Sequence, residues 1–138
     1  MNKLEVNCDL KELETIYKFI FDDSFFDDSK IKTIQLKLEL VIEEIFTNIV
    51  KFSQNFVDKI IIQYELYFEK IIIQICDKGI PFNPLLKENV DVSLDVDSRE
   101  IGGLGIFIVK EFVNKLDYKY LNNMNILTIE KSFNEELN

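Results

Sequence analysis

Hydrophobic positions change their spacing along the chain, and each change predicts a new structural element. Strict alternation over residues 3–7 predicts a short strand with one buried face. From Asp9, which suits a helix cap, apolar residues recur at helical spacing and predict a first helix. The acidic run 21–29 follows and predicts a surface loop. We expect its Phe25 and Phe26 to turn back into the core, with a membrane or partner-binding role as the alternative.

Residues 30–52 form the longest periodic segment and predict a helix that faces the core. Within it, Glu44 and Asn48 are four residues apart and therefore lie on one helical face. Asparagine is unfavourable inside a helix because its amide competes for backbone hydrogen bonds. A binding role would explain Asn48, whereas a solvated side chain or a local kink would explain it without one. The apolar stripe consists of Ile31, Ile34, Leu38, Val41, Ile42, Ile45, Ile49 and Phe52.

Two β-branched and aromatic runs over residues 59–77 predict a hairpin with its turn around Glu69 and Lys70. The second strand ends at Asp77, and Gly79 follows, where we expect an unusual backbone conformation. A carboxylate at a strand end beside a glycine can accept a hydrogen bond from a ligand. An ordinary turn aspartate remains the alternative.

The polar, aperiodic residues 85–101 predict a long loop of the kind that serves as a lid. Three of the chain's four glycines follow at once, at positions 102, 103 and 105. Apolar residues at helical spacing come next, so we expect a glycine loop that leads into a helix ending near Lys115. The free amides of a helix start attract anions, and a nucleotide phosphate is the obvious one. A plain glycine loop is the alternative.

The order of elements predicts the fold class. Two further strands, within residues 117–133 and joined at residues 122–125, complete the order β-α-α-β-β-loop-α-β-β. This order predicts an α+β fold: a two-layer α/β sandwich with a mixed, mostly antiparallel sheet and helices on one face. At 138 residues and 47% hydrophobic content, we expect residues 1–138 to form a single domain.

Composition excludes several classes of function. The net charge of −9 argues against a nucleic-acid partner, which would favour a basic face. The chain has no histidine, which rules out Ser-His-Asp and Cys-His catalysis and leaves carboxylates and lysines as candidate bases. Cys8 and Cys76 lack C-x-x-C spacing, so we expect reduced thiols without zinc or a disulfide. Without a signal peptide or an apolar span, we expect a cytoplasmic protein with no membrane partner.

Three motifs occur in a fixed order: E-E-I-F-T-N at residues 43–48, D-K-G-I-P-F-N-P at 77–84 and R-E-I-G-G-L-G-I-F-I-V at 99–109. Together they make the sequence resemble the GHKL ATP-binding superfamily from about Leu4 to Lys131. Within that superfamily it is similar to the bacterial anti-sigma-factor serine/threonine kinases. The motifs resemble the N box and the first and second glycine boxes.

The resemblance implies a role for each motif. Asn48 would be the Mg²⁺ ligand and Glu44 the catalytic base. Asp77 would accept a hydrogen bond from the adenine amino group, and Gly79 would let the backbone approach the ring. Lys51 would face the phosphates, with a solvated lysine as the alternative. Further nucleotide-binding residues would be Gly102, Gly103, Leu104 and Gly105 at the phosphates and Asn125 at the adenine.

Two positions depart from the family pattern. Ile101 stands where the commoner kinase pattern has a glycine, which here is Gly102, so the path of the lid is less certain than the phosphate contacts. Phe52 stands where many relatives have a histidine.

The resemblance implies an ATP- and Mg²⁺-dependent serine/threonine protein kinase. Its substrate would be an anti-anti-sigma (STAS) protein, a sigma factor would be a second candidate partner, and a homodimer would be typical of the family. The first alternative is a non-catalytic nucleotide-binding module that switches partners by sequestering a sigma factor. The second is an α/β domain that binds no nucleotide. The presence of both Glu44 and Asn48 favours the enzyme, since a pure binder needs no base beside the metal.

Overall fold

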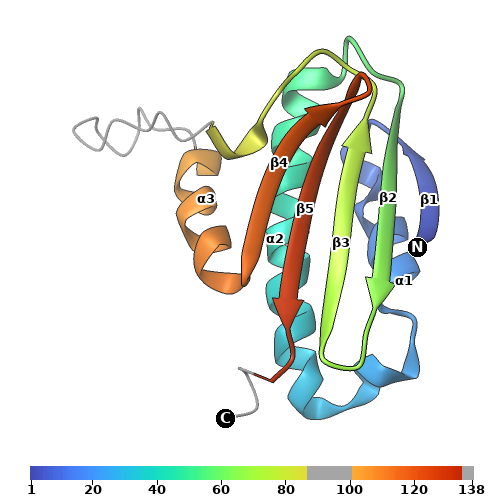
Figure 1. Ribbon diagram of the computed structural model, residues 1–138, viewed down its shortest axis with the longest axis vertical. Coiled ribbons are helices and arrows are strands. Elements are labelled where there is room, and N and C mark those ends of the chain that lie inside the picture. Colours follow the sequence, from blue (N-terminus) through green and yellow to red (C-terminus); the bar gives the residue numbers. More distant parts are fainter. Residues whose placement is uncertain (87–100, 135–138) are drawn as a thin grey trace.

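The chain folds into a five-stranded sheet with strand order β1-β2-β3-β5-β4 (Figure 1). The computed structural model describes residues 1–86 and 101–134. For residues 101–104 it describes the backbone only. All four strand pairings are antiparallel, so the sheet is antiparallel throughout where a mixed, mostly antiparallel one was predicted, and the predicted α+β class is confirmed. The strands are β1 (Asn2–Asn7), β2 (Lys59–Leu66), β3 (Lys70–Asp77), β4 (Lys115–Leu121) and β5 (Met124–Ser132).

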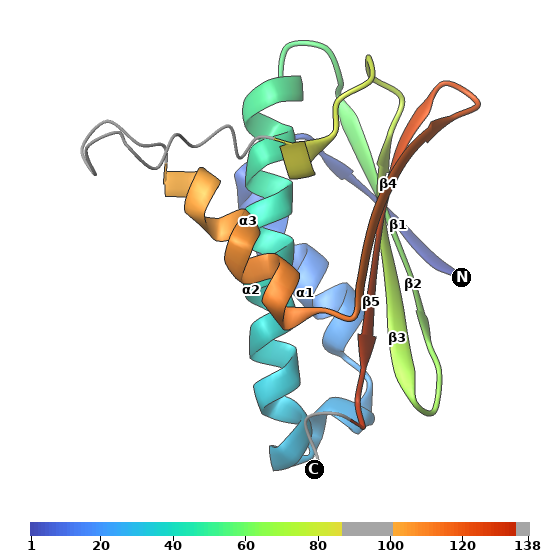
Figure 2. The same ribbon diagram turned by 60° about the vertical axis from the view of Figure 1, so that its left-hand side comes forward.

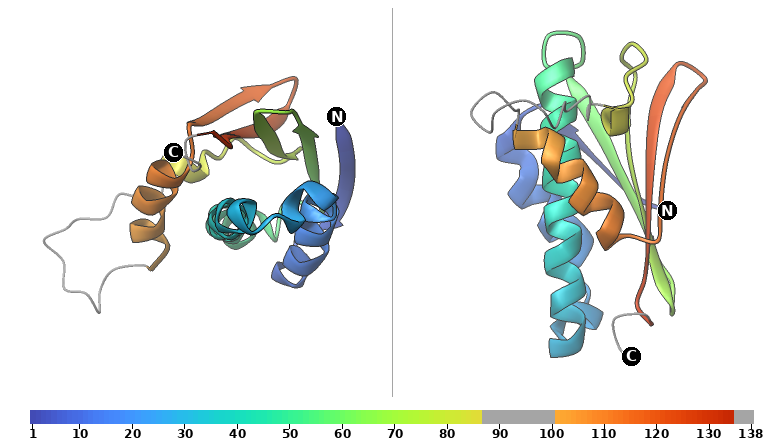
Figure 3. Two further views of the ribbon diagram at one scale, coloured as in Figure 1. Left: turned by 90° about the horizontal axis from the view of Figure 1, so that it is seen from below. Right: turned by 90° about the vertical axis from the view of Figure 1, so that its left-hand side faces the viewer.

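The α-helices lie together on one face of the sheet (Figure 2). Seen along the sheet, α2 occupies the middle of this layer, with α1 towards β1 and α3 towards β4 (Figure 3). The core fills the space between the two layers, as expected for a two-layer sandwich. The helices are α1 (Leu13–Phe21), α2 (Ser29–Ser53) and α3 (Ile101–Phe112).

Helix α2 matches its prediction to within a residue at each end. It begins where the Asp28 carboxylate accepts a hydrogen bond from the Lys30 amide at 2.8 Å. The predicted apolar stripe faces the sheet, and most of its side chains are fully buried. The buried stripe holds α2 against the sheet along its length. The positions of the polar residues on the rest of the helix are therefore defined too.

The acidic run between α1 and α2 holds its phenylalanines as predicted. It forms a short 3₁₀ turn, Ser24–Asp27, in which Phe26 is fully buried. The Phe25 ring packs on the Phe133 ring with centroids 4.6 Å apart. This pair therefore closes one end of the core.

The glycine stretch differs from the prediction. Helix α3 already begins at Ile101, so all three glycines lie within its first turns and not in a preceding loop. The helix ends at Phe112, and β4 starts at Lys115. Helix α3 packs closely against α2, and this close packing requires a glycine at position 105, as described below. Of the predicted lid, residues 85–101, the first two belong to the 3₁₀ turn Pro84–Leu86, the last is the first residue of α3, and residues 87–100 lie outside the described residues.

The β4–β5 hairpin is tighter than predicted. Its turn consists of Asn122 and Asn123, whose φ angles are 54° and 61°, a two-residue turn that asparagine tolerates. Asn125 therefore lies inside β5, directly opposite Asp77 of β3. This register brings two predicted nucleotide-binding residues together.

Candidate functional site

Helix α2 carries one end of the candidate site. Asn48 is only 1% exposed, and neither its amide oxygen nor its amide nitrogen has a hydrogen-bond partner among the described residues. Glu44 lies one turn earlier and is half-buried, while Lys51, three residues later, is exposed. A buried polar group without a partner costs about 1–3 kcal/mol. Asn48 is thus poorly suited to the empty protein and well suited to a polar ligand.

The Asn48 side chain fits a magnesium ligand. Its amide oxygen is a hard donor of the type Mg²⁺ prefers. No group of three or more acidic, histidine or cysteine side chains that could hold a metal occurs among residues 1–86 and 101–134. A metal at Asn48 would therefore share its coordination sphere with phosphates and water, which is usual for Mg²⁺ in nucleotide sites. When bound, the ion would neutralise part of the phosphate charge.

Glu44 meets the glycine helix. A Cβ atom added to Gly105 would clash with the Glu44 carboxylate, lying 2.5 Å from each of its oxygens. Gly105 does not have a positive φ, so the close approach of α3 to α2, and not backbone freedom, requires glycine here. The structure thus brings the first and third sequence motifs into contact. A mainly apolar cavity of about 150 Å³ borders both residues.

Asp77 lies at the end of β3 and is 4% exposed. Its Oδ1 accepts hydrogen bonds from the Gly79 amide at 2.8 Å and from Asn125 Nδ2 at 2.9 Å. A Cβ on Gly79 would lie 2.6 Å from Val57 Cγ2 and 2.9 Å from Asp77 Oδ1. The prediction of an unusual backbone conformation at Gly79 is wrong, because its φ is not positive. Glycine is required here because there is no room for a Cβ atom.

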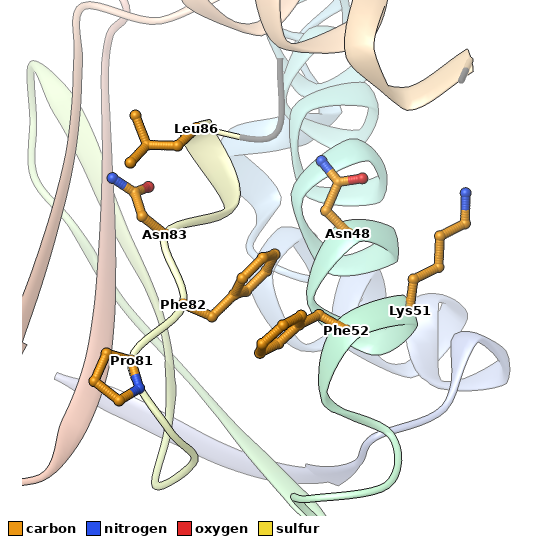
Figure 4. A pocket seen from close by; sticks show the side chains of 7 residues that line it. All are labelled: Asn48, Lys51, Phe52, Pro81, Phe82, Asn83 and Leu86. Atoms are coloured by element: carbon orange, nitrogen blue, oxygen red, sulfur yellow. The ribbon is translucent and has the colours of Figure 1, made fainter. Parts of the chain in front are cut away.

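A cavity of about 520 Å³ opens between the C-terminal half of α2 and the segment after β3 (Figure 4). The Phe52 and Phe82 rings stack across it with centroids 4.0 Å apart and an interplanar angle of 8°. In the sequence, Phe52 belongs to the apolar stripe of residues 30–52 and departs from the family pattern, but no residue pattern points to this stack. The lining residues are Asn48, Lys51, Phe52, Pro81, Phe82, Asn83 and Leu86.

The predicted site residues form three neighbouring groups. Asn48 and Lys51 line the large cavity, and Glu44 and Gly105 line the small one. Asp77, Gly79 and Asn125 line neither, although the Phe82 amide donates to Asn125 Oδ1 at 2.9 Å and so connects them to the cavity wall. The structure places the backbone of Gly102, Gly103 and Leu104 in the first turn of α3.

Both cysteines are free thiols. Burial raises the pKa of Cys8 and of Cys76, and the nearby Asp77 carboxylate raises both further. A raised pKa keeps a thiol protonated and poorly nucleophilic at neutral pH.

None of the described helices has the length and apolar character needed to cross a membrane.

The fold is a two-layer sandwich whose central helix carries Asn48 and Glu44 beside the glycine-containing start of α3. Residues 16–131 match the family model of the histidine kinase-like ATPase domain. The chain belongs to this family, which confirms its resemblance to the GHKL superfamily.

Individual relatives are more distant. The chain is 27% identical over 105 residues to the serine-protein kinase RsbW of Listeria monocytogenes serovar 1/2a, and 26% identical to that of Listeria innocua serovar 6a. Each match covers 72% of this chain and 66% of the relative, just under two thirds of its length.

Two solved structures share the fold. The Acinetobacter baumannii histidine kinase AdeS superposes with a TM-score of 0.51 at 14% identity, over 97% of this chain and 68% of that chain. A nucleotide-free form of the catalytic domain of the histidine kinase ThkA gives 0.50 at 16% identity, over 99% of both chains. At these identities, the likeness concerns the fold alone.

Proposed function

We propose that this chain is a protein kinase that binds Mg²⁺ and ATP and transfers the γ-phosphate to a serine or threonine of an anti-anti-sigma (STAS) protein. The observation that carries this proposal is the buried Asn48 amide, which has no hydrogen-bond partner among the described residues. Family membership supports ATP as the nucleotide. The similarity to two serine-protein kinases, the RsbW proteins of Listeria, supports serine as the acceptor.

The proposed roles follow the geometry of α2 and α3. Asn48 holds the metal, and Lys51 reaches from the rim of the large cavity towards the phosphates. Glu44, one turn from Asn48, orients the acceptor hydroxyl and takes its proton. The hydroxyl oxygen forms a bond to the γ-phosphorus, the bond from that phosphorus to the β–γ bridging oxygen breaks, and ADP leaves. The backbone amides of Gly102 and Gly103, which lie in the first turn of α3 where helix amides lack intrahelical partners, provide the remaining phosphate contacts.

The adenine lies at the sheet end of the site in this proposal. Asp77 accepts a hydrogen bond from the adenine amino group, and Gly79 leaves room for the ring. A sigma factor is a second proposed partner, and a homodimer is the proposed assembly, both by analogy with the family. The reaction needs no histidine, which agrees with a chain that contains none.

A transfer assay with matched variants tests the proposal. Wild-type protein is incubated with Mg²⁺, [γ-³²P]ATP and a panel of purified STAS proteins from the same genome. We expect label on one of them, a loss of several orders of magnitude in Glu44→Gln with ATP affinity kept, and weaker Mg²⁺-dependent ATP binding in Asn48→Ala. Equal transfer by Glu44→Gln would show that Glu44 is not the base. ATP binding without transfer to any STAS protein would favour the non-catalytic module.

A further inference from the structure

The nucleobase end of the proposed site is built from two facing strands. Asp77 on β3 pairs directly with Asn125 on β5, and the two side chains are 4% and 5% exposed. Both belong to the alternating set of residues that points towards the helical layer. A buried carboxylate and a buried amide thus meet across the sheet at the edge of the site.

The Asn125 amide uses its full hydrogen-bonding capacity. Its Nδ2 donates to Asp77 Oδ1 and to the Ile80 carbonyl, each at 2.9 Å. Its Oδ1 accepts from the Phe82 amide at 2.9 Å and from the Tyr118 hydroxyl at 2.6 Å. A side-chain amide has two N–H donors and two lone pairs on its oxygen. Asn125 therefore has one possible orientation and no capacity left for a direct bond to a ligand.

The same hydrogen bonds determine which oxygen of the Asp77 carboxylate can bind a ligand. Among the residues that the structure describes, the Gly79 amide and Asn125 Nδ2 donate to this carboxylate, and both bind Oδ1. Oδ2 is the oxygen left to accept a bond from a ligand. Burial raises the pKa of Tyr118, a hydrogen bond with the Phe82 backbone lowers it in part, and nearby Asp77 and Tyr120 raise it further. The pKa is raised on balance, so the hydroxyl stays protonated and able to donate at neutral pH.

We propose that Asn125 and Tyr118 are positioning residues that hold Asp77 Oδ2 towards the nucleobase and thereby select a base with an amino group over one with a carbonyl. This inference rests on the proposed function, because it takes a purine nucleotide as the ligand. Asn125 acts through Asp77 and does not touch the base. Tyr118, on a different strand, acts through Asn125.

The chemistry predicts a preference that can be measured. ATP offers an amino group at the six-position of its purine, and that group donates to a carboxylate oxygen. Inosine triphosphate has a carbonyl at the same position, whose oxygen repels a carboxylate. A polar pocket discriminates strongly against a partner that leaves its buried group unpaired. We expect the wild-type protein to bind ATP at least about a hundredfold more tightly than inosine triphosphate.

Replacing the carboxylate by an amide makes the sharpest test. In Asp77→Asn, the new amide oxygen should stay with the two donors from Gly79 and Asn125, because an amide nitrogen cannot accept them. The new N–H group then faces the base and favours the carbonyl of inosine triphosphate. We expect the ATP-to-inosine-triphosphate affinity ratio, measured by isothermal titration with Mg²⁺, to fall at least about a hundredfold. An unchanged ratio would overturn the inference.

Milder variants test the positioning residues. Tyr118→Phe removes one hydrogen bond to Asn125 and should lower the affinity ratio about three- to tenfold. Tyr67→Phe, at the β2–β3 turn far along the sheet, is the matched control and should leave the ratio unchanged (Figure 1). A general loss of folded protein lowers the binding of both nucleotides equally and leaves their ratio constant. The ratio therefore separates positioning from stability.

The outcomes also separate this inference from the function beneath it. Wild-type protein that prefers ATP, together with a Tyr118→Phe variant of the same ratio, would refute the positioning role and leave the nucleotide site standing. Wild-type protein that binds neither nucleotide would overturn both. A lowered ratio in Tyr118→Phe and Asp77→Asn, with the Tyr67→Phe control unchanged, would support the inference.

Discussion

Replacing Asn48 by leucine should stabilise the empty protein and abolish its response to Mg²⁺ and ATP. The side chain is 1% exposed, and its two polar atoms have no hydrogen-bond partner among the described residues. Leucine has a similar volume and no polar atoms. Removing the unsatisfied amide should therefore raise the free energy of unfolding by about 1–3 kcal/mol. For a chain of this size, that corresponds to a rise in melting temperature of roughly 2–4 °C per kcal/mol.

The ligand response should change in the opposite direction. Saturating ligand at a hundred times its dissociation constant stabilises a wild-type site by about 2.7 kcal/mol. Asn48→Leu has no oxygen to offer the metal, so its melting temperature should not rise with Mg²⁺ and ATP. Both effects are read by calorimetry on the same two samples, with and without ligand. A more stable empty protein together with a lost ligand-induced rise in melting temperature is expected only where a polar side chain serves binding and not folding.

A matched variant and a clear contrary result complete this test. Asn55→Leu, an exposed position just beyond the end of α2, should alter neither the melting temperature nor the ligand response appreciably. A drop in the melting temperature of empty Asn48→Leu would mean that the amide is satisfied in the folded protein. A full ligand response in that variant would mean that the metal lies elsewhere.

Three further predictions follow from the contacts of the site. Gly105→Ala should displace the Glu44 carboxylate and lower the rate of phosphoryl transfer about tenfold or more, while the melting temperature changes little. In a Glu44→Gln background, Gly105→Ala should lower the transfer rate no further. Phe52→Ala should remove the stack on Phe82 and lower the free energy of unfolding by about 1–3 kcal/mol in urea titrations, whereas Phe52→Tyr should retain it. Burial raises the pKa of the Cys8 thiol above 9.0, so the stability that the protonated thiol contributes is full below pH 9 and is lost as the pH rises further. The free energy of unfolding of Cys8→Ala should therefore fall less steeply above pH 9 than that of the wild-type protein.

The sequence carried most of the fold because its patterns are local. The apolar period of α2 and the β-branched runs of β2 and β3 each specify their own element, and the structure matches them closely. Asn48 was also visible, since an asparagine inside a helix contradicts the local preference. Its complete burial was not, because that depends on what packs over it.

Contacts between distant segments were beyond such reasoning. The meeting of Gly105 with Glu44 depends on how closely α3 approaches α2, which no local pattern encodes. The four bonds of Asn125 depend on strand register. One signal for that register was present: the adjacent Asn122 and Asn123 are typical of a two-residue hairpin turn. The sequence prediction has Asn125 at the joint that opens the last strand, and the two-residue turn places it one residue inside that strand.

The two ends of the candidate site differ in how far they are prepared for a ligand. At the sheet end, the Asn125 amide is fully bonded, and Asp77 is held by two donors, so this end needs little rearrangement to bind a base. At the helix end, Asn48 is covered and unsatisfied among the described residues, so ligand binding there must expose it and can recover the cost. A preorganised end supplies specificity cheaply, whereas an end that changes on binding couples the phosphates to the surrounding structure. On this argument, base selectivity and any dependence of conformation on the phosphates are separate properties, set by different residues.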